Sequence, residues 1–198
     1  MNRTGIGALL LCVGGLAACQ DTVGIETTPL TVVLTDAPGD VLEARVTISA
    51  IYLQGGSDPV TGSGPVTLLS EPFTTDLLTL ASDFATMVDG LEVPSGTYEQ
   101  LRFVVDGAFL RVEDDAGAER VWATPGYSEA PAQVDGTLMC PSCSQSGLKV
   151  TMAGGIVLDG TPRTLVVDFD VGESFGHEAG QSGKWVMHPS LKAIPPAS

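Results

Sequence analysis

The stretch ARVTISAIYL, from Ala44 to Leu53, decides the fold class of this 198-residue chain. From Ala44 to Ile48 its apolar and polar side chains alternate with a period of two, which is typical of a β-strand with one buried face. The alternation slips between Ile48 and Ile51, as it does where a β-bulge inserts one residue. The sequence therefore predicts a bulged, half-buried strand here.

Runs of the same kind recur on both sides of this stretch, and Gly, Pro, Asp and Ser separate them. Turn signals follow one another at short intervals, and no long amphipathic helix interrupts them. We therefore predict an all-β fold, an antiparallel β-sandwich of about nine strands with an immunoglobulin-like or prealbumin-like arrangement. Further runs include Leu30–Thr35, Val66–Leu69, Tyr98–Val105, Phe109–Glu113, Arg120–Ala123, Leu148–Met152, Thr164–Val171 and Leu191–Ile194.

Four stretches between these runs have their own local signals. Asp76–Met87 is the stretch that could form one or two helical turns. Val93–Gly96 has Pro in the second position of a turn. Asp114–Gly117 and Asp159–Pro162 have the composition of hairpin turns.

The N-terminus resembles a bacterial lipoprotein signal. Arg3 is followed by the apolar run Gly5–Gly15, which is too short to span a bilayer permanently, and then by Leu16-Ala17-Ala18-Cys19. Small residues before a cysteine are typical of a lipobox, although an ordinary signal peptide can also contain a cysteine. We predict a signal at residues 1–18, lipidation of Cys19, a tether at 19–29, one domain at 30–194 and a tail at 195–198.

Such a chain would be held in the cell envelope by its acyl chains, facing the periplasm or the exterior. Gln20, rather than Asp, after the lipidated cysteine favours the outer over the inner membrane. The formal net charge is −15, and loss of the signal would remove Arg3 and make the chain more negative. This charge excludes nucleic acid as a partner and leaves no electrostatic attraction to anionic lipid.

Four segments resemble the family called domain of unknown function 4382. Leu34–Pro38 is similar to its opening LTDAP, and Pro94–Arg102 to its central segment. Ser146–Lys149 and Val167–Asp170 follow in the family's order, with Ser174 and His188-Pro189 near the end. The resemblance implies a secreted or surface-attached bacterial β-sandwich module and no particular activity. The chain departs from the family at Cys140-Pro141-Ser142-Cys143, where a cysteine-free turn is usual.

Gly172-Glu173-Ser174-Phe175-Gly176 matches the Gly-x-Ser-x-Gly pattern of a serine hydrolase. That chemistry needs the serine on a sharp turn between an apolar parallel strand and a helix. Here acidic residues precede Ser174 and a glycine-rich stretch follows it, with only Glu178 and His188 in the order of a catalytic triad. We therefore expect a loop that closes a β-hairpin, and a protein that is not an enzyme.

Cys140 and Cys143 have three interpretations. A zinc site would need two more ligands, and only His177 and His188 remain, without the usual spacing. A redox centre would need a helix N-terminus at the first cysteine. A disulfide in an oxidising compartment needs nothing more, so we predict one. The two histidines are then polar groups of a loop and a strand end.

The acidic residues Asp36, Asp40, Asp168 and Asp170 are the candidates for a ligand site. Asp168 and Asp170 lie two apart on a predicted strand, so their carboxylates share a face and repel, which favours Ca²⁺ or a basic partner. The alternative is a solvated outer face, with Asp36 bound to amides of its own turn. No metal site is assigned, and no cofactor is expected.

Trp122, Trp185, Tyr52 and Tyr127 could form a platform on which sugar rings stack, or could be buried aromatic residues of the sandwich. Together these patterns predict a non-enzymatic, lipid-anchored envelope protein that binds or scaffolds a glycan or a protein. The alternative is a purely structural module stabilised by Ca²⁺. A serine hydrolase is the third and weakest hypothesis.

Overall fold

The computed structural model describes residues 25–37, 41–55, 64–80, 84–114, 116–141, 143–175, 182–187 and 190–194. This part of the chain consists of strands with two single helical turns, a 3-10 turn η1 (Leu77–Leu80) and α1 (Val171–Phe175). The strands are β1 (Thr27–Ala37), β2 (Glu43–Gln54), β3 (Val66–Leu69), β4 (Phe73–Asp76), β5 (Ala85–Pro94), β6 (Gly96–Glu113), β7 (Glu119–Ala123), β8 (Gly136–Met139), β9 (Leu148–Leu158), β10 (Arg163–Asp170), β11 (Lys184–Val186) and β12 (Leu191–Ile194).

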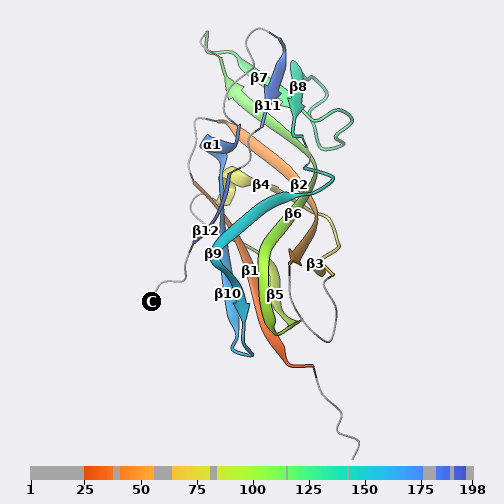
Figure 1. Ribbon diagram of the computed structural model, residues 1–198. Coiled ribbons are helices and arrows are strands. Elements are labelled where there is room, and N and C mark those ends of the chain that lie inside the picture. Colours follow the sequence, from red (N-terminus) through yellow and green to blue (C-terminus); the bar gives the residue numbers. More distant parts are fainter. Residues whose placement is uncertain are drawn as a thin grey trace, which may run out of the picture.

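Two sheets pack face to face, which confirms the predicted all-β sandwich (Figure 1). The small sheet has the order β12-β10-β1-β5. The large sheet has the order β11-β8-β7-β6-β2-β3, with β4 added to β2 and β9 added to β6. Both sheets are mixed rather than purely antiparallel, because β1 runs parallel to β10 and β8 runs parallel to β7 and β11. Alternation along one strand says which face is buried, but it carries no information on the direction of the neighbouring strand.

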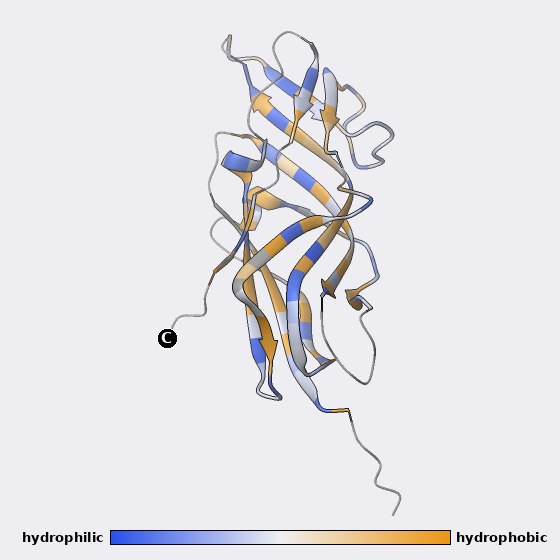
Figure 2. Ribbon diagram, in the orientation of Figure 1, coloured by the Kyte–Doolittle hydropathy of each residue, from blue (hydrophilic) through white to orange (hydrophobic). Residues whose placement is uncertain are grey.

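The core lies between the sheets and is built by alternate residues of each strand. Leu165, Val167 and Phe169 of β10 are at most 4% exposed, whereas the residues between them are partly exposed. Leu30, Val32 and Leu34 of β1 are fully buried on the same side. The alternation of hydrophobic and hydrophilic segments along the ribbon shows this pattern (Figure 2). Removal of these side chains from water is the main stabilising contribution to such a fold.

The predicted bulge in the strand Ala44–Leu53 is confirmed. The register of β2 on β6 shifts between Thr47 and Ile48 and again between Ile48 and Ala50. After the shift the buried positions continue at Ile51. Both halves of β2 therefore keep their apolar side chains in the core.

Several local predictions need correction. β5 was not predicted: in the described part of Asp76–Met87 the expected helical turn is η1, and the strand β5 begins at Ala85. Asp89 and Gly90 interrupt the apolar alternation of β5, since four consecutive residues there are exposed. The turn at 159–162 joins β9 of the large sheet to β10 of the small one, so it is a connection between sheets and no hairpin. Asp114–Gly117 does close the predicted hairpin, between β6 and β7.

The far end of the large sheet has a second apolar cluster on its other face. Phe109, Val121 and Ala123 form it, and Tyr127 packs against them from the segment after β7. This approach requires Gly107, because a Cβ there would lie 2.3 Å from the Tyr127 ring. The segment between β7 and β8 is therefore held against the sheet, and the candidate site lies next to it.

Candidate functional site

A hollow of about 280 Å³ is lined by residues of β7 and of the segments just before β8 and β11. These three strands lie together at one end of the large sheet (Figure 1). Asp114, from the turn after β6, and Arg120 and Trp122, from β7, line it together with Asp135 and Gly183. Arg120 and Trp122 are two apart on one strand and so share a face. Asp114 is brought to them by the β6–β7 hairpin.

Two carboxylates fix the guanidinium of Arg120. Its Nε donates to Asp114 Oδ2 at 3.1 Å, and its Nη1 donates to Asp135 Oδ1 at 3.2 Å. No acceptor for Nη2 lies among the residues that the structure describes. Arg120 is 47% exposed, so these contacts orient its side chain without covering it.

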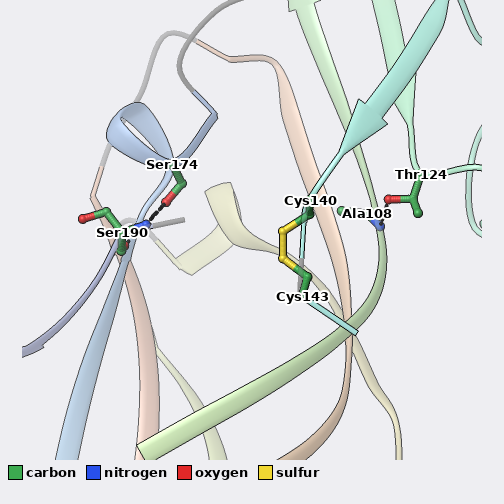
Figure 3. The surroundings of a disulfide bond; sticks show 6 residues. All are labelled: Ala108, Thr124, Cys140, Cys143, Ser174 and Ser190. Carbon is green, nitrogen blue, oxygen red and sulfur yellow. Dashed lines mark hydrogen bonds between the residues drawn. A yellow bond between two sulfur atoms is a disulfide. The ribbon is translucent and has the colours of Figure 1, made fainter. Parts of the chain in front are cut away.

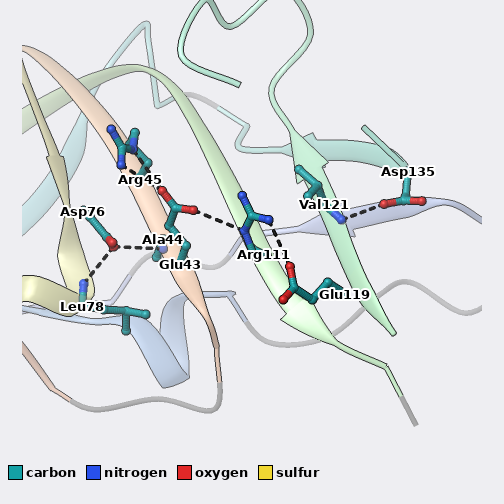
Figure 4. A network of polar contacts seen from close by, with 9 residues as sticks. All are labelled: Glu43, Ala44, Arg45, Asp76, Leu78, Arg111, Glu119, Val121 and Asp135. Atoms are coloured by element: carbon teal, nitrogen blue, oxygen red, sulfur yellow. Dashed lines mark hydrogen bonds and ion pairs between the residues drawn. The ribbon is translucent and has the colours of Figure 1, made fainter. Parts of the chain in front are cut away.

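The two carboxylates are themselves held by backbone amides. Asp114 Oδ1 accepts the N–H groups of Ala116 and Ala118. Asp135 Oδ2 accepts the N–H of Val121 at 2.9 Å, as Figure 4 shows. The Ala118 amide is the main cause that lowers the pKa of Asp114, and the Val121 amide is the main cause for Asp135. Both groups are therefore ionised at neutral pH.

Trp122 also lines the hollow, although its side chain is only 7% exposed. Its ring lies 4.7 Å from that of Trp185, centroid to centroid. The indole Nε1–H is buried and has no acceptor among the described residues. Gly136 is required beside it, because a Cβ at this position would lie 2.5 Å from both Nε1 and the carbonyl oxygen of Gly183.

A second hollow, of about 440 Å³, shares part of its lining with the first. Arg120 and Asp135 line both hollows, and Gln133 and Arg111 are among the other residues of the second. Arg111 is bound to Glu43 at 3.2 Å and to Glu119 at 3.1 Å, so charged side chains continue across β2, β6 and β7 (Figure 4).

The predicted acidic residues of β10 lie elsewhere, on the outer face of the small sheet. Asp170 accepts the N–H of Glu173 at 2.9 Å, and this bond is the main cause that lowers the pKa of Asp170. Lys192 Nζ lies 3.1 Å from Asp170 and 3.0 Å from Glu173. A lysine therefore occupies the position that a bound cation would take beside Asp170.

Asp168 shares this face and is opposite Lys192 in the β10–β12 register. Its Oδ1 is buried without a partner among the described residues, and burial is the main cause that raises its pKa. Asp36 lies on β1 in register with Phe169, while Asp40 is outside the described residues. Within the described ranges no group of three or more His, Cys, Asp or Glu could hold a metal ion.

The Gly-x-Ser-x-Gly stretch begins with the helical turn α1 instead of the expected hairpin loop, and the flanking strands β10 and β11 belong to different sheets. Ser174 is fully buried, and its Oγ accepts the N–H of Ser190 at 2.9 Å (Figure 3). In this geometry the hydroxyl holds the start of β12. His177 and His188 lie outside the described residues.

Cys140 and Cys143 are joined by a disulfide in the connection between β8 and β9 (Figure 3). Their Cα atoms are 5.6 Å apart, and Cys143 is 3% exposed. The carbonyl of Cys143 accepts the N–H of Val105 at 3.1 Å. The disulfide thus lies where this connection is attached to β6. The predicted lipidation site, Cys19, is outside the described residues.

Of the four aromatic candidates, the structure brings only Trp122 and Trp185 together. Tyr52 donates its hydroxyl hydrogen to the carbonyl of Ser146, and Tyr127 shares a hydrogen bond with Thr47. Sequence reasoning missed Arg120 and Asp135. The hairpin signal at Asp114–Gly117 could have paired Asp114 with Arg120, but nothing in the sequence places Asp135, fifteen residues further on, beside them.

No helix in the described part of the chain has the length and apolarity needed to cross a membrane. No curated protein and no solved structure matches the chain. One family does match, the one described as Domain of unknown function (DUF4382), and the match covers residues 27–189. That range contains both sheets apart from β12. The chain therefore belongs to the DUF4382 family.

Proposed function

We propose that this protein is a lipid-anchored, non-enzymatic binding module of the bacterial envelope and that its ligand is a glycan. The sequence Leu16–Cys19 supports the anchor, and Gln20 supports the outer membrane. In this proposal β1 begins eight residues after the lipidated Cys19, so the sandwich lies close to the membrane that holds it.

The hollow above Trp122 carries the proposal. Sugars have apolar ring faces that pack on aromatic side chains and hydroxyl groups that pair with carboxylates and guanidinium groups. Trp122 supplies the small exposed part of its ring, and Arg120 and Asp135 supply charged hydrogen-bonding groups beside it. Because backbone amides and ion pairs fix these groups, little side-chain entropy is lost when a ligand binds.

The other two hypotheses have less support. For the Ca²⁺-stabilised module, Lys192 is already ion-paired with both Asp170 and Glu173 on the acidic face and so competes with a bound cation. For the hydrolase, Ser174 is buried and bound to the backbone of Ser190.

A glycan array probed with the full chain, purified in detergent, tests the proposal. We expect binding that is competed by the free sugar and unchanged by EDTA. Failure to bind any glycan on the array, combined with capture of an envelope protein, would replace the glycan by a protein ligand. A rise in melting temperature with millimolar Ca²⁺ and no glycan binding would favour the structural module.

A further inference from the structure

We propose that the ligand, if it is a glycan as proposed above, is a neutral oligosaccharide of at least two sugar units that lies across Arg120. This inference rests on the proposed function and adds to it the length and the charge of the ligand. Its support is that two hollows share Arg120 and Asp135, and that the charged groups around these residues are net negative.

Two adjoining hollows share their central residues. The first, of about 280 Å³, is at the lower limit for a small-molecule site, which favours a single ring over Trp122. The second, of about 440 Å³, is lined by the same Arg120 and Asp135. A ligand that fills both must therefore pass along this ion pair, with one sugar unit in each hollow.

The hydrogen bonds of Arg120 orient its guanidinium for contact with such a ligand. Its Nε and Nη1 are used by Asp114 and Asp135, and Nη2 has no acceptor within the described residues. The guanidinium is thus held rigidly with donors left for a ligand oxygen. Asp135 uses each carboxylate oxygen once, so it retains acceptor capacity for a sugar hydroxyl.

The charges disfavour an acidic sugar. Arg120 and Arg111 line the hollows, and each is paired with two carboxylates. Those four are Glu43, Asp114, Glu119 and Asp135, and Arg45 is also paired with Glu43, so three cations meet four carboxylates and the network is net negative, as is the chain at −15. A uronate or phosphate group would be repelled, whereas a neutral hydroxyl can both donate and accept.

The two tryptophans provide the measurement. The chain has only Trp122 and Trp185; Trp122 lines the first hollow, and its ring is in contact with that of Trp185. A ligand there should change the intrinsic fluorescence. The probes are di- to tetrasaccharides of glucose, mannose, galactose and N-acetylglucosamine, their monosaccharides, and the di- to tetramers of galacturonate as acidic counterparts.

We expect a neutral oligosaccharide to bind about tenfold more tightly than its monosaccharide and than galacturonate oligomers, since the second unit adds two or more hydrogen bonds. Arg120→Gln should weaken oligosaccharide binding about tenfold. The matched control Arg163→Gln changes an exposed arginine outside both hollows and should leave binding unchanged. Asp135→Asn keeps an acceptor for the Val121 amide but removes one charge, so galacturonate binding should improve roughly three- to tenfold.

Trp122→Phe keeps an aromatic ring and removes the indole N–H, and it serves if Arg120→Gln does not fold. Its binding is measured calorimetrically and should be weaker for monosaccharide and oligosaccharide alike. Equal affinity for monosaccharide and oligosaccharide, preference for galacturonate, or oligosaccharide binding unaffected by Arg120→Gln would overturn this inference and leave glycan binding standing. Absence of binding to any sugar, in both the array and this panel, would instead refute the proposed function.

Discussion

Replacing Ser174 with alanine removes one buried hydroxyl and leaves one amide without its partner. In the folded protein the Oγ of Ser174 accepts the N–H of Ser190 at 2.9 Å. The carbonyl of Ser190 in turn accepts the N–H of Asp170 at 3.1 Å. These two bonds attach the start of β12 to the end of β10 and to α1. Loss of the first should therefore loosen β12 in particular.

The expected cost follows from the burial of the groups. An unsatisfied buried amide costs about 1–3 kcal/mol, and Ser190 is only half-buried, so a value near the lower end is expected. For a domain of this size each kcal/mol lowers the melting temperature by roughly 2–4 °C. Ser174→Ala should therefore lower it by about 2–6 °C.

Urea denaturation and calorimetry measure this loss, with Ser70→Ala as the matched control at an exposed serine. Hydrogen exchange should increase at residues 190–194 in Ser174→Ala and nowhere in the control. A fluorophosphonate probe should label neither the wild type nor Ser174→Ala. A variant as stable as the wild type, or Ser174-dependent labelling, would refute the assignment of this hydroxyl to a structural role.

Three further changes test other parts of the molecule. Cys19→Ala should abolish incorporation of labelled palmitate and partition into detergent in a bacterial host, and label that persists would contradict the lipobox. Exported protein should be two hydrogens lighter than its reduced form and free of zinc, and bound zinc or two free thiols would show that the pair was misinterpreted. The Cys140→Ser, Cys143→Ser double variant should still fold, and its free energy of unfolding should fall by at most about 2 kcal/mol because the closed loop is very short. Burial raises the pKa of Asp168, so the protonated carboxyl is favoured more in the folded protein than in the unfolded chain. Protonation of Asp168 therefore stabilises the fold at low pH, and this stabilisation is lost as the pH rises through the raised pKa. Asp168→Asn should therefore raise the free energy of unfolding at pH 7 and have little effect at about pH 3, and an effect that is larger at the acidic pH would be inconsistent with this sign.

The β-strands with regular alternation could be predicted from the sequence, because burial of one face leaves a direct pattern in the residues. The bulge between Ile48 and Ile51 is an example, since a single inserted residue changes the parity of every later side chain. β5 could not be found in this way, because the exposed residues around Asp89 and Gly90 break the alternation of buried and exposed positions.

The candidate site was less accessible to sequence reasoning. Trp122 and Trp185 were recognised as aromatic candidates, but their contact depends on the parallel pairing of β8 with β11, which joins segments nearly fifty residues apart. Arg120 and Asp135 meet because the segment after β7 is folded back against the sheet by Tyr127 and Gly107. Such tertiary contacts leave no periodic signal along the chain.

The parallel pairing of β1 with β10 ties the order of folding to the far end of the chain. β1 can pair with β5 once about ninety residues have been made, but its other edge has no neighbour until β10, at Arg163–Asp170, follows. During that interval Leu30, Val32 and Leu34 belong to a strand with one open edge, the kind of surface on which unfinished chains aggregate. Contacts this distant in sequence also form slowly. We therefore expect an incomplete chain that lacks β10 to aggregate more readily than the complete one.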